Sequence, residues 1–223
     1  YVIILTILLS SCGQLISMKM NSVANVVHGI TFAADREKVY VPLDEVERRL
    51  NFQIPSPANY KPSRKLTDGL ALISLAELAD EGIKLMSAES GKTTRVSHFV
   101  QGFDVVVGLK HVEVDLSEQR LRAWQGERLV LETRVSSGKN GTTPSGHFRA
   151  GPYKARLHYS KLYDNAPMPW SVQVNGNVFI HGFSSVPSYP ASHGCIRVPL
   201  NEGNPARFFY EWIDINTPVR LRD

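Results

Sequence analysis

The sequence predicts a mainly β domain with a short C-terminal helix, preceded by a small α+β domain. Apolar and polar residues alternate in most of the chain after residue 110, and the turn-forming pair Asn175-Gly176 separates two of the alternating runs. Within residues 38–90, a short apolar run is twice followed by apolar residues three or four positions apart. The first pattern is typical of half-buried strands and the second of amphipathic helices. We therefore expect a small domain at 34–94 and a larger one at 108–223.

Composition is that of an ordinary globular protein. The 223 residues are 43% hydrophobic and 21% charged, and 25 Lys and Arg against 21 Asp and Glu give a net charge of +4. No basic run or aromatic-rich motif indicates nucleic-acid binding. Cysteine occurs at two positions only, Cys12 and Cys195, so a zinc site built from several thiolates is excluded. Cys195 is expected to be a free thiol.

The N-terminal residues resemble an export signal. Residues 1–9 form an apolar run that is too short to span a membrane, and Leu-Ser-Ser-Cys-Gly at 9–13 resembles the bacterial lipobox. We expect residues 1–12 to be a signal peptide in which Cys12 is lipidated, and 13–33 to be a tether. The protein would then be exported to the cell envelope and anchored to the membrane by lipid. A plain secretory signal is the alternative.

The predicted small domain contains a weak strand–helix repeat, because residues 39–46 align with 71–78. Pro42 and Ser74 stand where each strand would give way to a helix, as residues that begin helices do. The pattern resembles the copper amine oxidase N-terminal-like stalk domains of bacterial envelope proteins. A generic α+β accessory domain fits it equally well. Copper is not implied, since the segment has no cluster of His, Cys or Met.

In the larger domain, alternation predicts strands near 112–116, 121–123 and 129–135. Asn175-Gly176 predicts a type I′ hairpin between 172–174 and 178–180, which places His181 at the end of the second strand. A helix from the N-cap Asn204 to about residue 213 and a closing strand at 218–221 complete the domain.

The candidate site is Ser-His-Gly-Cys-Ile-Arg at 192–197, together with His181. A thiol becomes nucleophilic when a base or a positive field favours its thiolate, and imidazole is the usual base. Backbone N–H groups of a turn that contains glycine can stabilise an oxyanion. These residue types predict an acyl-transfer site with Cys195 as nucleophile. Spacing alone leaves both His181 and His193 as candidate bases.

Residues 110–223 resemble the L,D-transpeptidase (YkuD-type) catalytic domain. The resemblance rests on His181 followed by the 192–197 motif, and on Val-Asp-Leu at 114–116, Gly-Lys-Asn-Gly at 138–141 and Met-Pro-Trp at 168–170. It implies a β-sandwich with a short C-terminal helix and requires neither a metal nor an organic cofactor. It also implies that His181 is the base and that the backbone carbonyl of Gly182 orients its ring.

The resemblance assigns the remaining site residues as follows. His193 and Gly194 would provide oxyanion-hole amides beside that of Cys195. Substrate contacts are expected from Arg197, Ser192, Trp170 and Tyr189, with Arg197 either binding a carboxylate or bracing the loop.

The implied reaction takes place on peptidoglycan. Cys195 would attack the carbonyl of the third residue of a stem tetrapeptide, release D-Ala and pass the acyl group from the thioester to an amine acceptor, which forms a 3→3 cross-link. Carbapenem-type β-lactams would acylate the same thiol. Hydrolysis of the thioester would instead make the protein an L,D-carboxypeptidase, and a non-catalytic cell-wall-binding module is a third reading. A non-catalytic module would be expected to have Cys195 or His181 replaced, and both residues are present.

Overall fold

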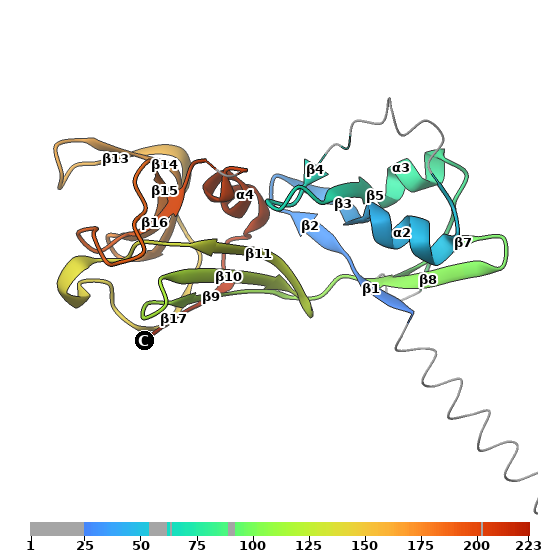
Figure 1. The fold of residues 1–223 in the computed structure, drawn as a ribbon, viewed down its shortest axis with the longest axis horizontal. Coiled ribbons are helices and arrows are strands. Elements are labelled where there is room, and N and C mark those ends of the chain that lie inside the picture. The colour runs from blue at the N-terminus through green and yellow to red at the C-terminus, as the bar shows by residue number, and fades with distance from the viewer. Residues whose placement is uncertain (1–24, 54–61, 63, 89–91, 202) are drawn as a thin grey trace, which may run out of the picture.

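The computed structural model describes residues 25–53, 62, 64–88, 92–201 and 203–223. The expected signal peptide with Cys12 and the first part of the expected tether lie outside these residues. Figure 1 shows an elongated molecule with residues 26–106 at one end and 110–222 at the other. In the described part of the chain, no helix is both long and apolar enough to cross a membrane. Most regular structure is strand, and one short helix lies near the C-terminus, which confirms the predicted mainly β fold class.

The first sheet of the C-terminal half brings the beginning and the end of this half together. The last strand pairs in parallel with the first, so that Val219 lies opposite Val112. Inward-pointing residues alternate with outward-pointing ones, as predicted, and Val112 and Val114 are buried. In spatial order the sheet consists of β11 (Arg128–Arg134), β10 (Arg120–Gln125), β9 (Lys110–Asp115), β17 (Pro218–Arg222) and β12 (Gly146–Arg149).

The second sheet carries the predicted catalytic residues. The expected hairpin forms, but its two-residue loop is Gly176-Asn177 rather than Asn175-Gly176, because Asn175 pairs directly with Val178. Gly176 has φ +50° and takes the first turn position, where glycine is favoured. The strand that follows Cys195, Ile196–Pro199, pairs in parallel with the second strand of this hairpin, and His181 lies opposite Arg197. In spatial order the sheet is β13 (Lys154–Ser160), β14 (Ala166–Asn175), β15 (Val178–Phe183) and β16 (Ile196–Pro199).

Helix α4 (Pro205–Trp212) shares one core with both sheets. It begins as predicted, because the Asn204 side chain accepts a hydrogen bond from a backbone N–H of the first turn at 3.0 Å. Phe209 and Trp212 on its apolar face have no exposed surface. Buried valines and leucines of both sheets belong to the same cluster. Burying aromatic side chains here contributes strongly to stability.

The described residues of the N-terminal half form two further sheets and two short helices. Each copy of the predicted repeat forms a strand followed by a helix: β3 (Asp35–Pro42) by α2 (Leu43–Leu50), and β5 (Ala71–Ser74) by α3 (Leu75–Asp80). Ser74 caps α3 in a reciprocal pair of hydrogen bonds with Glu77. One sheet has the order β2 (Ile30–Phe32), β3, β5, β4 (Arg64–Lys65), and the other β1 (Val26–His28), β8 (Gln101–Val106), β7 (Thr93–His98), β6 (Lys84–Ser87).

Two segments differ from the expected organisation. Residues 26–32, expected to belong to the tether, form strands β1 and β2, whose valine, isoleucine and phenylalanine side chains complete buried clusters. Residues 93–106, which lie at and beyond the expected end of the small domain, form the β7–β8 hairpin of the same half. Both patterns are short, and such strands are stable only within a larger sheet, which β1 joins by pairing with the distant β8.

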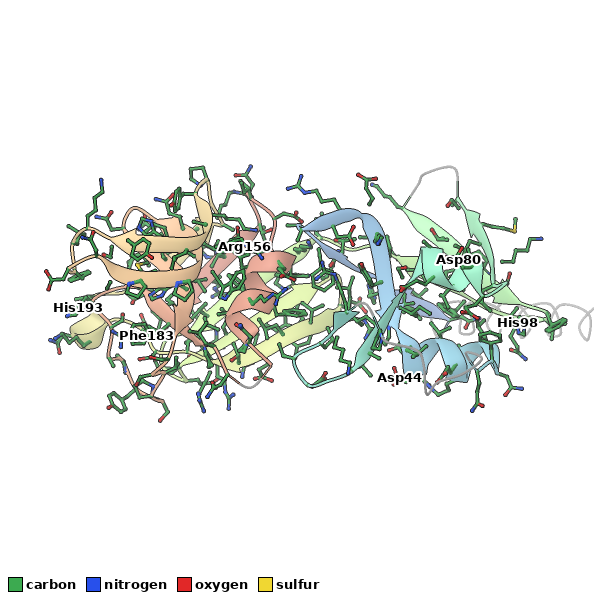
Figure 2. All side chains as sticks on the ribbon, turned by 90° about the horizontal axis from the view of Figure 1, so that it is seen from above. Asp44, Asp80, His98, Arg156, Phe183 and His193 are labelled. Carbon is green, nitrogen blue, oxygen red and sulfur yellow. The ribbon has the colours of Figure 1, made fainter. Side chains whose placement is uncertain are left out.

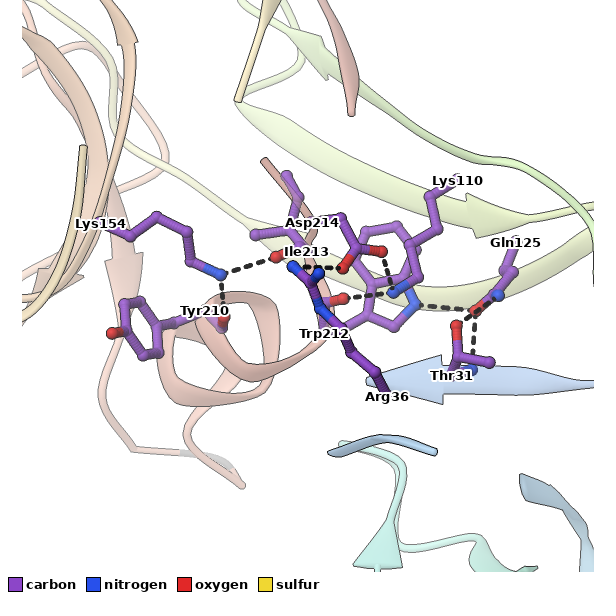
Figure 3. A network of polar contacts seen from close by, with 9 residues as sticks. All are labelled: Thr31, Arg36, Lys110, Gln125, Lys154, Tyr210, Trp212, Ile213 and Asp214. Atoms are coloured by element: carbon purple, nitrogen blue, oxygen red, sulfur yellow. Dashed lines mark hydrogen bonds and ion pairs between the residues drawn. The ribbon is translucent and has the colours of Figure 1, made fainter. Parts of the chain in front are cut away.

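The two halves are joined by apolar and polar contacts. Ile30, Phe32 and Tyr40 of the N-terminal half belong to the core cluster of the C-terminal half. In Figure 3 the Lys110 ammonium donates to the Trp212 carbonyl at 2.6 Å and to the carboxylate of Asp214 at 2.8 Å. Burial lowers the pKa of Lys110, and the Asp214 contact opposes this effect.

Arg36 and Thr31 reach the same network from the N-terminal half. The Arg36 guanidinium lies 3.6 Å from the Asp214 carboxylate. The side-chain oxygen of Gln125 accepts a hydrogen bond from the Thr31 backbone N–H at 3.0 Å, and the side-chain nitrogen of Gln125 donates to the Thr31 hydroxyl at 2.8 Å. Lys154 donates to the carbonyls of Tyr210 and Ile213. The last carbonyls of α4 have no partner within the helix, and two lysines bind them from outside.

Candidate active site

The loop that carries Cys195 is held by backbone and hydroxyl hydrogen bonds. The Ser192 N–H donates to the Ser137 carbonyl at 2.9 Å, and the Ser192 carbonyl accepts from Lys139 N–H at 2.9 Å. Lys139 begins a short 3-10 turn, Lys139–Gly141. Ser192 is buried, and its hydroxyl donates to the carbonyl of Cys195. Ser192 therefore braces the loop, and it also lies among the residues that line the cleft described below.

Gly194 gives the loop its shape. Its φ of +142° is a conformation that residues with a side chain rarely adopt. The Gly194 N–H donates to the Ser192 hydroxyl at 3.0 Å, and its carbonyl accepts from Thr143 at 2.8 Å. This amide is therefore already engaged, in contrast to the expectation that it faces an oxyanion. The N–H groups of His193 and Cys195 are the amides left for that purpose.

Cys195 lies half-buried at the end of this loop, directly before β16. Its thiol donates to the Asn177 carbonyl in the β14–β15 turn at 3.5 Å. Burial raises the pKa of the thiol, whereas the backbone of Phe179 and the charge of Arg197 act to lower it. The resting group is therefore a protonated thiol at neutral pH.

His181 lies on β15 and is 5% exposed. Its Nδ1 is 2.9 Å from the carbonyl of Gly182, and because a carbonyl only accepts, Nδ1 carries the proton and Nε2 has a free lone pair. The Gly182 carbonyl thus contacts the His181 ring, as the family resemblance implies. Burial, and secondarily the Arg197 charge, lower the pKa of His181 to about 4, while the hydrogen bond to Gly182 opposes the change. Burial therefore keeps His181 neutral at pH 7 and makes it a weaker base than an exposed histidine.

Cys195 and His181 line one cleft of about 440 Å³. His193, Gly194 and Arg197 also line it, so the structure brings together most of the site residues that the sequence predicts. No aspartate or glutamate is among the described residues that line it. In this structure the Cys195 thiol donates its hydrogen bond to the Asn177 carbonyl rather than to His181.

One wall of the cleft was not anticipated. Residues 158–163, at the end of β13 and in the turn that follows, line it, and the Tyr163 ring stacks on His193 with centroids 4.5 Å apart. Large apolar side chains stay exposed here: Tyr159 by 51%, Leu162 by 65% and Tyr163 by 43%. Such residues in a polar turn are the signal by which the sequence could have revealed this wall.

Two expected substrate contacts lie elsewhere. Trp170 has φ +57° and packs on Tyr210 with ring centroids 5.6 Å apart, outside the residues that line the cleft. Tyr189 is 63% exposed, also outside that lining, and its carbonyl accepts a hydrogen bond from Ser136 at 2.8 Å. An unusual backbone conformation breaks the alternation of β14, which sequence periodicity could not foresee.

Arg197 supplies positive charge to the cleft. Its guanidinium lies 4.1 Å from the centroid of the Phe183 ring. Among the residues described it forms no ion pair and donates no side-chain hydrogen bond, so its five donors remain available to a ligand. Within the described ranges, no three His, Cys, Asp or Glu side chains come together in an arrangement that could hold a metal ion.

Comparison with known proteins identifies the C-terminal half. The L,D-transpeptidase catalytic domain (YkuD) matches residues 109–221. No curated protein matches the chain. Similar solved structures include an L,D-transpeptidase from Stackebrandtia nassauensis (23% identity, 63% of this chain, 59% of that one, TM-score 0.46). Another is the L,D-transpeptidase from Xylanimonas cellulosilytica (32% identity, 52% and 61%, TM-score 0.45).

A third is L,D-transpeptidase 3 from Mycobacterium tuberculosis, in complex with a faropenem-derived adduct (16% identity, 89% and 94%, TM-score 0.43). The chain spans about three fifths of the length of the first two. The family match covers half of the chain and includes every residue of the 192–197 motif and His181. This protein therefore belongs to the family of L,D-transpeptidase catalytic domains.

Proposed function

We propose that the protein is an L,D-transpeptidase that cross-links peptidoglycan through a thioester on Cys195. The observation that carries the proposal is the shared cleft, which is lined by a half-buried free thiol, by a neutral imidazole with an unprotonated Nε2 and by a guanidinium that forms no ion pair within the described residues. A nucleophile, a base and a cation for an anionic substrate are what acyl transfer from a stem peptide requires.

In the first half of the reaction the Cys195 proton passes to Nε2 of His181 as sulfur attacks the carbonyl carbon of the third stem residue. The carbon–nitrogen bond to D-Ala then breaks, and the leaving amine takes the proton from His181. A neutral imidazole with a pKa of about 4 is a weak base. The forming thiolate is an opposite charge beside it, which raises its proton affinity during the transfer.

In the second half an amine attacks the thioester and loses a proton to His181. The carbon–sulfur bond then breaks, and the departing sulfur of Cys195 takes that proton back from His181 and becomes the thiol again. The backbone N–H groups of His193 and Cys195 would stabilise the oxyanion in both halves. Arg197 would bind a carboxylate of the donor, because its guanidinium faces a cleft without acidic lining residues.

Two further expectations become part of this proposal. Carbapenem-type β-lactams would acylate Cys195 by the same attack, which opens the β-lactam ring; a similar L,D-transpeptidase structure is a complex with the carbapenem imipenem. Export with a lipid on Cys12 would place the enzyme at the membrane, next to its polymeric substrate. Cys12 lies outside the described residues, so this part rests on the lipobox resemblance alone.

The test is incubation of the full chain with a purified stem tetrapeptide and an amine acceptor, followed by mass spectrometry of the products. We expect released D-Ala, a cross-linked product and, with a carbapenem, one covalent adduct on the intact protein. Cys195→Ala and His181→Ala should lose all three, whereas His147→Ala, which alters an exposed histidine outside the cleft, should retain them. Release of D-Ala by Cys195→Ala refutes the nucleophile. Free tripeptide in place of cross-linked product identifies a carboxypeptidase.

A further inference from the structure

The tip of the β7–β8 hairpin exposes two adjacent apolar side chains. His98 pairs with Gln101, so Phe99 and Val100 alone form the turn. Phe99 is 93% exposed and Val100 94% exposed. Phe99 also has φ +49° at the first turn position, where glycine or asparagine is favoured and a bulky residue is unusual. Neither packing nor turn geometry explains a Phe-Val pair here, which indicates a function outside the fold.

The exposed ring is the end of an aromatic row. Phe52 contacts the His98 ring with centroids 4.8 Å apart, and His98 contacts Phe99 at 4.4 Å. The row supports Phe99 from behind and leaves its outer edge in solvent. The turn and its neighbours at 97–102 contain no Lys, Arg, Asp or Glu. Its partner would therefore be apolar and not selected by charge.

The chain enters the folded part of the protein at the same end of this sheet. β1 runs parallel to β8, with Val26 opposite Asp104, so residue 25 lies on the side of the hairpin tip. The Asn25 side chain donates to the Gly102 carbonyl at 2.8 Å, and its own carbonyl accepts from Asp104 N–H at 2.9 Å. Gly102 is two residues from Val100.

The sequence upstream points to a lipid bilayer as the partner. An apolar run at 1–9 and the lipobox-like Cys12 precede Asn25, and the twelve residues between Cys12 and Asn25 span at most about 40 Å. Anchoring through that segment would keep the tip within this distance of the bilayer. A tether of this length greatly raises the effective concentration of a weak membrane contact.

The geometry points to Phe99 and Val100 as a membrane-inserting tip that stands the protein upright on the bilayer. Figure 2 shows His98 at one end of the molecule and His193, in the catalytic cleft, at the opposite end. Inserting the tip would therefore hold the cleft away from the membrane, on the side where a cell-wall polymer lies. This inference does not depend on the reaction at Cys195.

The experiment uses the full chain and vesicles of phosphatidylcholine, with and without 30% phosphatidylglycerol, that carry brominated acyl chains at defined depths. In Phe99→Trp, a new indole reports whether the tip enters the bilayer. We expect Phe99→Trp to show bromine quenching beyond that of the wild-type tryptophans, to a similar extent in both vesicles and at high salt. The matched control is Leu109→Trp, because Leu109 is 89% exposed but lies between β8 and β9, away from the tip.

A second pair of variants measures the contribution of the tip. Phe99→Asp/Val100→Asp should bind vesicles at least about tenfold more weakly than Leu109→Asp, with unchanged circular dichroism and unchanged carbapenem acylation in solution. The inference is overturned if the Trp at 99 is not quenched, whether the protein binds vesicles or not. It is also overturned if the double variant turns a dimer into a monomer, since the tip would then bind a second copy.

Discussion

The buried imidazole of His181 predicts a specific dependence of stability on pH. Its pKa is lowered from an ordinary 6.5 to about 4, chiefly by burial. Between these values the unfolded chain binds a proton that the folded protein does not bind. Stability from this group is therefore fully present above pH 6.5 and is lost as the pH falls through about 4. The perturbation that isolates it is His181→Asn, which removes the titrating ring.

The expected size follows from the two pKa values. The difference between 6.5 and about 4 corresponds to about 3 kcal/mol when the transition is complete, and about 2.5 kcal/mol of this is already lost at pH 4.5. Other titrating groups contribute equally to wild type and variant. The difference between their unfolding free energies should therefore shrink by this amount between pH 7.5 and pH 4.5.

Urea unfolding followed by circular dichroism at both pH values measures the quantity. His181→Gln provides a second variant, and both should give the same pH-dependent difference although their stabilities at pH 7.5 differ. A pH-dependent difference below about 0.5 kcal/mol, or one of opposite sign, would show that the ring is protonated in the folded protein at pH 4.5. His181 could then be a stronger base than its burial suggests.

Three further predictions concern contacts that support the site and the junction between the two halves. Gly182→Ala places a methyl group against the Leu200 side chain, closer than van der Waals contact allows. We expect a loss of about 1–3 kcal/mol of stability and slower carbapenem acylation, and adding Leu200→Ala should partly restore both. Gln119→Ala leaves the buried Ser137 N–H without its 2.7 Å acceptor and should cost about 1–3 kcal/mol by urea unfolding. Gln119→Glu keeps an acceptor but loses the side-chain donor to the Leu116 carbonyl and buries a carboxylate, so it should cost at least as much. Arg128→Ala removes the two hydrogen bonds, at 2.9 and 3.0 Å, from the guanidinium to the Glu45 carboxylate of helix α2. We expect a loss of about 1–2 kcal/mol of stability and faster proteolysis within residues 26–106. Unchanged proteolysis would mean that this ion pair does not help to hold the two halves together.

Much of the fold could be predicted because local chemistry specifies it. Asn204 followed by proline begins α4, Ser74 caps α3, and a glycine turn joins β14 to β15. The motif at 192–197 with His181 likewise indicated which side chains share a cleft, since that order of residue types is unusual in a globular chain. The turn itself is shifted by one residue, because pairing across the sheet, rather than turn preference, sets its position.

The sequence by itself determined the mainly β class, the helix starts and the identities of the thiol, the imidazole and the cation. Only the tertiary structure decided their states: burial keeps His181 neutral, Ser192 engages the amide of Gly194, and the turn at Asn177 receives the resting thiol. It also assigned the cleft wall to residues 158–163 rather than to Trp170. These outcomes depend on contacts between segments far apart in the chain, and a one-dimensional pattern does not contain the solvent exposure, hydrogen-bond partners or backbone angles that such contacts impose.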